Sequence, residues 1–207
     1  MTTFSATIYN ALAGAASTDP HRSYMTAVRV EPHSSGHGAI LVATDGHILA
    51  AAYDTMATVP EPVSVTTDKS LVKATRLKKA DHIKITNNWD FYNAEVLASN
   101  GEKLHIQPGG LLLSEYPDWR HIVTAINPAG PATGHFSVNV ADRVASTSRA
   151  LSAAFYGEKI PALIWSQNEP TDPALVRIVG IDNAFMIAMP MRVVDERVSR
   201  GLPGWMS

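Results

Sequence analysis

The sequence contains no cysteine, and this absence excludes disulfide bridges and thiolate metal sites. No stretch approaches the roughly 18 consecutive apolar residues that a membrane-spanning helix needs, and the N-terminal segment MTTFSATIYN lacks the basic start of a secretory signal. A formal net charge of -2 excludes the broad basic coat of a free-standing DNA-binding domain, although it is compatible with a local basic stripe. We therefore expect a cytoplasmic protein without membrane contact.

What is present is an ordinary globular composition. Hydrophobic residues make up 45% of the 207 positions and charged residues 17%. This balance is far from that of disordered chains and is sufficient for a buried core. The length fits one large domain or two smaller ones.

The chain carries none of the common motifs of catalysis or phosphate binding, since GxGxxG, GxxxxGK[ST], GxSxG and HExxH are all missing. His33 and His37 lie four residues apart in a Ser/Gly-rich stretch, but no third ligand accompanies them, which favours solvated loop histidines over a metal site. Asp45 and His47 could pair as a carboxylate and a base, yet a tight turn explains both residues. We expect no enzyme activity, no cofactor and no metal, with a hydrolase as the distant alternative.

Turn residues divide the chain into three stretches of similar length, each with a helical segment followed by alternating strands. Helices are predicted over about residues 7–16, 68–77 and 141–155, with Asp68 as an N-cap and Gly157 as a stop signal. The order βαβββ is thus predicted three times.

Short alternating or apolar runs give the strands of this pattern. Asp45-Gly46 and Asn100-Gly101 each predict a two-residue hairpin turn, and a type I′ turn wants positive φ at both central positions. Strands are predicted at about residues 25–30, 39–42, 63–65, 136–140, 162–165, 175–179 and 184–189, and within the segments 83–88, 93–101 and 102–110.

Three segments match the signatures of one known family in order and approximate separation. VATDGHILA at 42–50, EYPDWRHIV at 115–123 and AFMIAMPMRV at 184–193 resemble the family's VATDGHRLA, FPDYRRV and YVVMPMRL. The chain therefore resembles the bacterial DNA polymerase III β subunit, the DNA sliding clamp, in a shortened form with the middle domain and the last half-domain. One such match alone would indicate only a hairpin turn or a strand that ends at a proline, whereas three in order are specific.

The resemblance implies an α+β protein with the DNA-clamp fold, in which βαβββ units carry helices on one face of antiparallel sheets around a central hole. It also implies a pocket into which DNA polymerase or repair proteins insert a clamp-binding peptide. Ile48 and His121 stand where the family signatures have Arg, so the rim should be more apolar and less cationic. The pocket residues carried over by position are Met25, Thr44, Gly46, His47, Ile48, Leu49, Pro117, His121, Ile122, Ile187, Met189, Pro190, Met191 and Arg192.

Members of the family are processivity factors in DNA replication, and they encircle double-stranded DNA without recognising a particular base sequence. A basic face on the predicted helix 68–77 fits this role, because its basic residues are spaced four and three apart; a solvated helix face is the alternative. The candidate DNA-binding residues are Lys69, Lys73 and Arg76 on this helix, Arg143 and Arg149 on the third helix, and Arg22 and Tyr24 in the segment HRSYM.

The resemblance divides the chain into a complete clamp-like domain at 1–125, a half-domain at 132–193 and a C-terminal tail at 194–207. An unpaired half-domain should seek a partner, which favours a homo-oligomer: four chains of three units each would supply the twelve units of the family's ring. The alternative is a non-ring decoy or adaptor that binds clamp-interacting proteins. A clamp loader stays open as a partner. Leu202, Trp205 and Met206 predict a tail that docks in the pocket and gates it, with surface packing as the alternative.

Overall fold

The computed structural model describes residues 1–88, 91–109, 111, 115–126, 130–157 and 160–192. Within these residues a strand, a helix and three further strands follow one another three times. The first unit contains β1 (Thr2–Ser5), α1 (Ala6–Ala13), β2 (Ala27–Pro32), β3 (Ala39–Thr44) and β4 (Ile48–Asp54). The second contains β5 (Val63–Thr66), α2 (Lys69–Thr75), β6 (Ala80–Asn88), β7 (Phe91–Ala98) and β8 (Lys103–Pro108). The third contains β9 (Gly130–Pro131), α4 (Val138–Tyr156), β10 (Leu163–Gln167), β11 (Ala174–Ile178) and β12 (Ile181–Ala188).

The predicted threefold βαβββ order and the α+β class are therefore confirmed. Two elements interrupt the repeat: the 3₁₀ helix η1 (Pro20–Met25) and the helix α3 (Trp119–Ala125). The predicted strand at 25–30 begins only at Ala27, because η1 occupies the residues before it.

Strand exchange joins the first two units. β1 of the first unit pairs with β6 of the second, and β5 of the second pairs with β2 of the first. The last strands of the first and third units, β4 and β12, also pair, with Leu49 opposite Ile187. The result is a four-stranded sheet in the order β1-β6-β7-β8 and an eight-stranded sheet in the order β5-β2-β3-β4-β12-β11-β10-β9. In the third unit, the first strand β9 pairs with β10 of its own unit.

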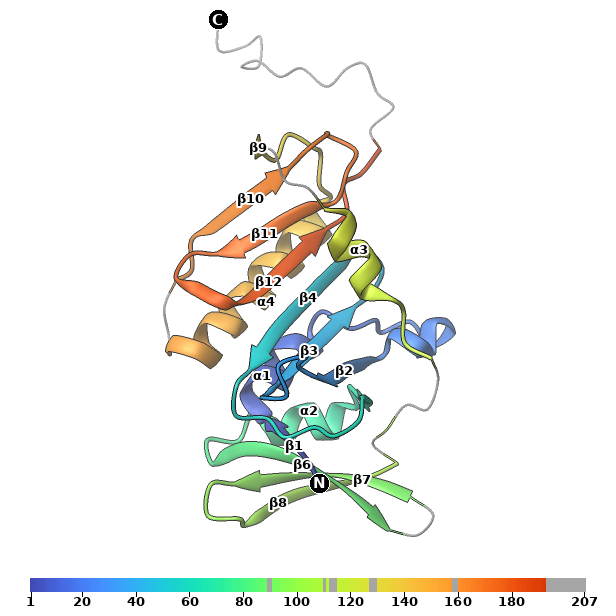
Figure 1. The fold of residues 1–207 in the computed structure, drawn as a ribbon, viewed down its shortest axis with the longest axis vertical. Helices are drawn as coiled ribbons and strands as arrows, with labels where there is room; N and C mark the ends of the chain where they lie inside the picture. The colour runs from blue at the N-terminus through green and yellow to red at the C-terminus, as the bar shows by residue number, and fades with distance from the viewer. Residues whose placement is uncertain (89–90, 110, 112–114, 127–129, 158–159, 193–207) are drawn as a thin grey trace, which may run out of the picture.

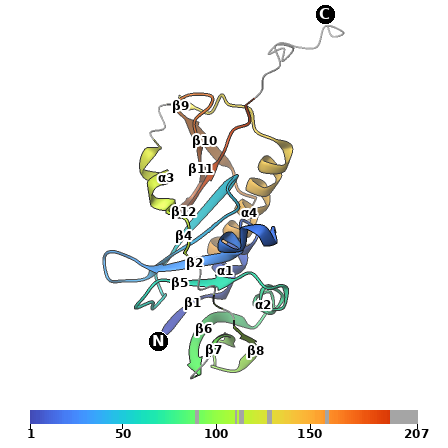
Figure 2. The same ribbon diagram turned by 90° about the vertical axis from the view of Figure 1, so that its right-hand side faces the viewer.

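The helices α1, α2 and α4 lie on one side of the sheets, and α3 lies on the opposite side of the eight-stranded sheet (Figures 1 and 2). α1 packs between α2 and α4 and also touches strands of both sheets, while α4 packs on β4 and β12. No helix in the described parts of the chain is long and apolar enough to cross a membrane.

Each helix begins at a polar side chain that accepts a hydrogen bond from a free backbone N–H of the first turn. Asp68 caps α2 as predicted, and Gly157 ends α4 with φ +79°. The predicted strand at 136–140 is wrong, because Ser137 accepts from the Val140 N–H and starts α4 there. The β-branched valines of this segment suggested a strand, but the cap decides its structure.

The two faces of β4 enter different cores because side chains alternate along a strand. Ile48 and Ala50 belong to the large core between the sheets and the helices α1, α2 and α4. Leu49 and Ala51 face the other side and pack with Trp119 of α3. The eight-stranded sheet is thus covered on both faces at the junction of β3, β4 and β12.

Candidate partner-binding surface

The turn between β3 and β4 is built by the side chains of Thr44 and Asp45. The Asp45 carboxylate accepts from the backbone N–H groups of His47 and Ile48 at 2.8 and 2.9 Å. The Thr44 hydroxyl accepts from the Gly46 N–H and donates to the Ile48 carbonyl. Asp45 N–H donates to the Ile48 carbonyl, so Gly46 and His47 are the central turn residues, one position later than predicted. Gly46 has a φ of +89°, which favours glycine.

The segment after β12 lies directly against this turn. The Met189 N–H donates to the His47 carbonyl at 2.9 Å, and the Met191 N–H donates to the His135 carbonyl at 2.7 Å. These two bonds fix the backbone on both sides of Pro190, which has no N–H of its own to donate. Met189 and Met191 are 38% and 50% exposed, so their flexible side chains form apolar surface beside the turn.

The face of the eight-stranded sheet that carries α3, called the outer face below, continues this apolar surface. Leu49 and Ile187 form a cross-strand pair and are buried beneath the segment that contains α3. Pro117 is half-buried at the start of this segment, where its carbonyl accepts from the Trp119 N–H. Ile122, on α3 itself, is 38% exposed. The helix therefore brings residues from a distant part of the chain to the two strands.

The structure places one predicted pocket residue, Ile48, on the opposite side of the sheet from this face, and buries another, Met25, next to the turn. Ile48 is 2% exposed and points into the core on the side of α1 and α4, so it does not alter the rim as we expected. The alternation of side chains along β4 is the reason. Met25 is buried at the end of η1, where its methyl group lies 3.9 Å from the Cβ that an alanine at Gly46 would carry. Met25 thus supports the turn from behind.

The polar candidates at the rim are exposed. His47 lies at the tip of the turn, His121 in the first turn of α3, and Arg192 at the end of the described chain. The Asp45 carboxylate accepts a hydrogen bond from the backbone N–H of His47. Among the described residues, no three histidine, aspartate or glutamate side chains gather in a way that could hold a metal ion.

Two arginines predicted to bind DNA also contact the turn. The Arg143 guanidinium on α4 donates to the Asp45 carboxylate and to the carbonyls of Gly14 and Ala16. Arg22 on η1 donates to the Asp45 carbonyl at 3.1 Å. Burial lowers the pKa of the Arg143 guanidinium, because the charged form loses contact with water. Sequence spacing gave no signal for these contacts, because they join residues 23 and 98 positions apart.

The remaining DNA candidates lie on the helix side of the sheets. Lys69 and Lys73 are exposed on α2, and Arg149 is exposed on α4. Arg76, the C-cap of α2, donates to the side-chain oxygen of Asn10 on α1, which ties the two helices together. Tyr24 is 42% exposed on η1.

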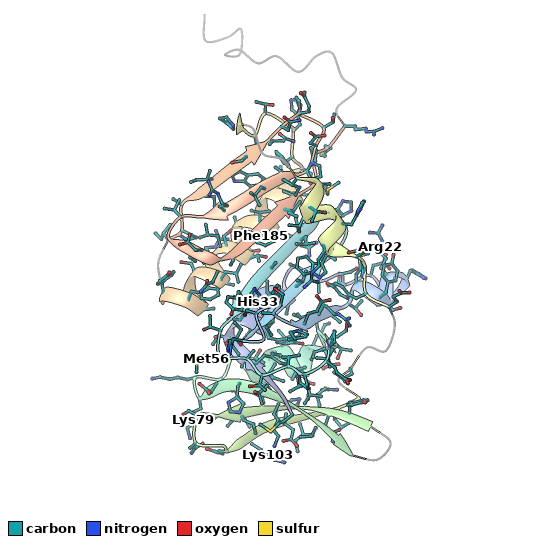
Figure 3. All side chains as sticks on the ribbon, in the orientation of Figure 1. Arg22, His33, Met56, Lys79, Lys103 and Phe185 are labelled. Carbon is teal, nitrogen blue, oxygen red and sulfur yellow. The ribbon has the colours of Figure 1, made fainter. Side chains whose placement is uncertain are left out.

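A hollow of about 540 Å³ beside α3 was not predicted from the sequence. It is lined by residues of β10, β11 and β12, including Ile164 and Phe185, together with Val123 of α3. Figure 3 marks the position of Phe185. The hollow extends the apolar outer face away from the Gly46 turn. The apolar residues of β10 to β12 do not predict this hollow, because a sequence does not distinguish apolar side chains that are buried from those that line a surface hollow.

Repeated βαβββ units, exchanged first strands and helices on one side of antiparallel sheets define a DNA-clamp fold. Solved sliding clamps share it. A DNA polymerase III β chain from Streptococcus pneumoniae superposes with a TM-score of 0.60 at 17% identity, covering 92% of this chain and 64% of that one. The β subunit from Thermotoga maritima gives 0.62 at 15% identity over 93% and 66%. A sliding clamp from Pseudomonas aeruginosa gives 0.61 at 15% identity over 92% and 65%.

The chain thus spans just under two thirds of the length of these clamps, which confirms the expected resemblance to a shortened clamp at the level of the fold. No protein-family profile and no curated protein matches the sequence.

Proposed function

We propose that this protein is a clamp-fold binding protein that captures a peptide segment of DNA polymerases or repair proteins. One observation carries the proposal: the hydrogen bond from Met189 to His47 joins the β3–β4 turn to the segment after β12, beside an apolar sheet face covered by α3. This arrangement offers exposed methionines next to a few oriented polar groups, which is the usual composition of a peptide site. The role is one of binding, without catalysis.

A known clamp ligand provides the test. Clamps from Bartonella birtlesii and Pseudomonas aeruginosa have been solved bound to griselimycin. We expect griselimycin to bind this protein in calorimetry and to displace a fluorescent clamp-binding peptide taken from a bacterial replicative polymerase. Met189→Ala should weaken peptide binding roughly tenfold, since it removes the contact area of one methionine.

Met56→Ala is the matched control, because Met56 is 87% exposed and lies after the opposite end of β4. Its peptide affinity should equal that of the wild type. Failure of both probes to bind the wild-type protein would refute the proposed function.

We further propose that several copies encircle double-stranded DNA, as a processivity factor does. The helices α1, α2 and α4 share one side of the sheets (Figure 2). Lys69 and Lys73 of α2 are exposed to solvent. Such a face attracts phosphates without reading bases. Three units per chain favour a homo-oligomer of four chains. The division into a domain at 1–125 and a half-domain at 132–193 is part of this proposal, as is recruitment by a clamp loader. The tail at 194–207 lies outside the described residues.

A second candidate is a non-ring adaptor that captures the same peptides. It is favoured by β9, which pairs with β10 and so occupies the sheet edge where another unit would join. Native mass spectrometry and retention on DNA separate the two. A tetramer retained on nicked circular DNA but lost after linearisation indicates a ring, whereas a monomer with equal affinity for both DNA forms indicates the adaptor.

A further inference from the structure

One nearly buried carboxylate gathers the contacts that shape the β3–β4 turn. Asp45 is 9% exposed. One of its oxygens accepts the backbone N–H groups of His47 and Ile48, and the other accepts the guanidinium of Arg143. The carboxylate therefore fixes the backbone of the turn through one oxygen and ties it to another element through the other.

Arg143 connects this turn to the rest of the molecule. Its second terminal nitrogen donates to the carbonyls of Gly14 and Ala16, at 3.0 and 3.2 Å, just beyond the end of α1. α1 belongs to the first unit and α4 to the third. A single guanidinium thus holds the turn, the end of α1 and α4 in one arrangement, across the boundary between two units.

We propose that Asp45 and Arg143 are positioning residues of the peptide-capture surface, so that Arg143 contributes to partner binding through the turn. The inference rests on the proposed peptide capture. Met189 is held by the carbonyl of His47, and His47 is held by the carboxylate of Asp45. Loss of the ion pair would free the turn to sample other conformations, and the affinity falls in proportion to the fraction of molecules that stay competent to bind.

A double-mutant cycle tests this coupling. Asp45→Asn keeps an oxygen that can accept from His47 and Ile48, yet it removes the charge that Arg143 contacts. We expect Asp45→Asn and Arg143→Ala each to weaken peptide binding roughly 5- to 20-fold, and the double variant to be no weaker than the stronger single variant. Arg143→Lys should recover part of the loss, because it restores the charge without the three-way contact.

The chain offers a matched control pair. Lys103 and Glu95 form another partly buried ion pair at 3.0 Å, on the four-stranded sheet at the opposite end of the molecule from β10 (Figure 3). Glu95→Gln and Lys103→Ala should lower the melting temperature through loss of one ion pair, and less than Arg143→Ala, which also loses the contacts with Gly14 and Ala16. Their peptide affinity should match that of the wild type.

The outcomes are distinct. Additive effects of Asp45→Asn and Arg143→Ala, or equal loss of peptide affinity in the Glu95 and Lys103 variants, would overturn the inference and leave only a general loss of stability. Unchanged peptide affinity in the Arg143→Ala variant would also overturn it. A wild-type protein that binds neither griselimycin nor the peptide would instead overturn the proposed function, before any variant is compared. An amide NMR shift of Gly46 and His47 in Arg143→Ala provides an independent readout of the turn.

Discussion

The Gly46→Ala variant separates the conformation of the β3–β4 turn from the general stability of the protein. At a φ of +89° an L-residue costs about 1–2 kcal/mol relative to glycine. The added Cβ would also lie 3.3 Å from a terminal nitrogen of Arg22, which donates to the Asp45 carbonyl. A small displacement of this nitrogen weakens the hydrogen bond, which adds up to about 1.5 kcal/mol. We expect a total loss of about 1–3.5 kcal/mol in the free energy of unfolding.

Gly101→Ala is the control for backbone strain alone. Gly101 has a φ of +84° in the β7–β8 turn, and its added Cβ would meet no atom within 4 Å. This variant should lose only the conformational cost of about 1–2 kcal/mol. Since about 1 kcal/mol shifts the melting temperature of a protein of this size by about 2–4 °C, thermal unfolding resolves both variants.

Peptide affinity is the decisive assay. Gly46→Ala should bind the fluorescent peptide at least several-fold more weakly, because the Met189 N–H donates a hydrogen bond to the carbonyl of His47, the residue that follows Gly46. Gly101→Ala should bind like the wild type. If Gly46→Ala loses stability as expected but binds the peptide normally, the turn does not shape the binding surface and the assignment of the site is refuted.

Three further experiments test the fold and the helix face. Gly134→Ala should cost about 1–3 kcal/mol, because its Cβ would lie 2.5 Å from a backbone carbonyl; Gly130→Ala meets nothing within 4 Å and should be near neutral in urea unfolding. Leu151→Ala, at a fully buried position on α4, should cost about 2–5 kcal/mol, and a loss below 1 kcal/mol would contradict its place in the core. Replacing Lys69 and Lys73 by alanine should reduce the slope of log K for DNA against log salt by up to about 0.9 for each lost phosphate contact, and an unchanged slope would contradict DNA contact by α2.

Local signals in the sequence predicted the repeated elements well. Caps such as Asp68 and stop signals such as Gly157 act within a few residues, so a sequence alone reveals them. The same logic could have found α3, since Asp118 follows a proline and accepts from the His121 N–H. The prediction of a strand at 136–140 was wrong. The alternating valines of this segment match a strand, whereas Ser137 at its second position caps a helix. Two local signals competed there, and the cap prevailed.

Long-range contacts could not be predicted in the same way. The pairing of β4 with β12 places Leu49 opposite Ile187, and no periodicity records such a register. The family resemblance named the two arginines Arg22 and Arg143 as DNA contacts by position, but their partners at Asp45 depend on how α4 and η1 pack. Ile48 shows the same limit: its match to a family signature did not reveal which face of β4 it occupies.

The third unit decides between a ring and an adaptor. In the first two units β2 and β6 each receive a first strand from the other unit, whereas β10 receives β9 from its own. Gln167 secures this closure, because its buried side chain accepts from the N–H groups of Thr133 and Gly134. In a ring whose third units pair as the first two units do, these hydrogen bonds would have to break. The strand β9 of each chain would then pair with β10 of the neighbouring chain. Gln167→Ala should therefore shift a ring-forming protein toward larger assemblies in native mass spectrometry, whereas an adaptor should stay monomeric and lose only stability.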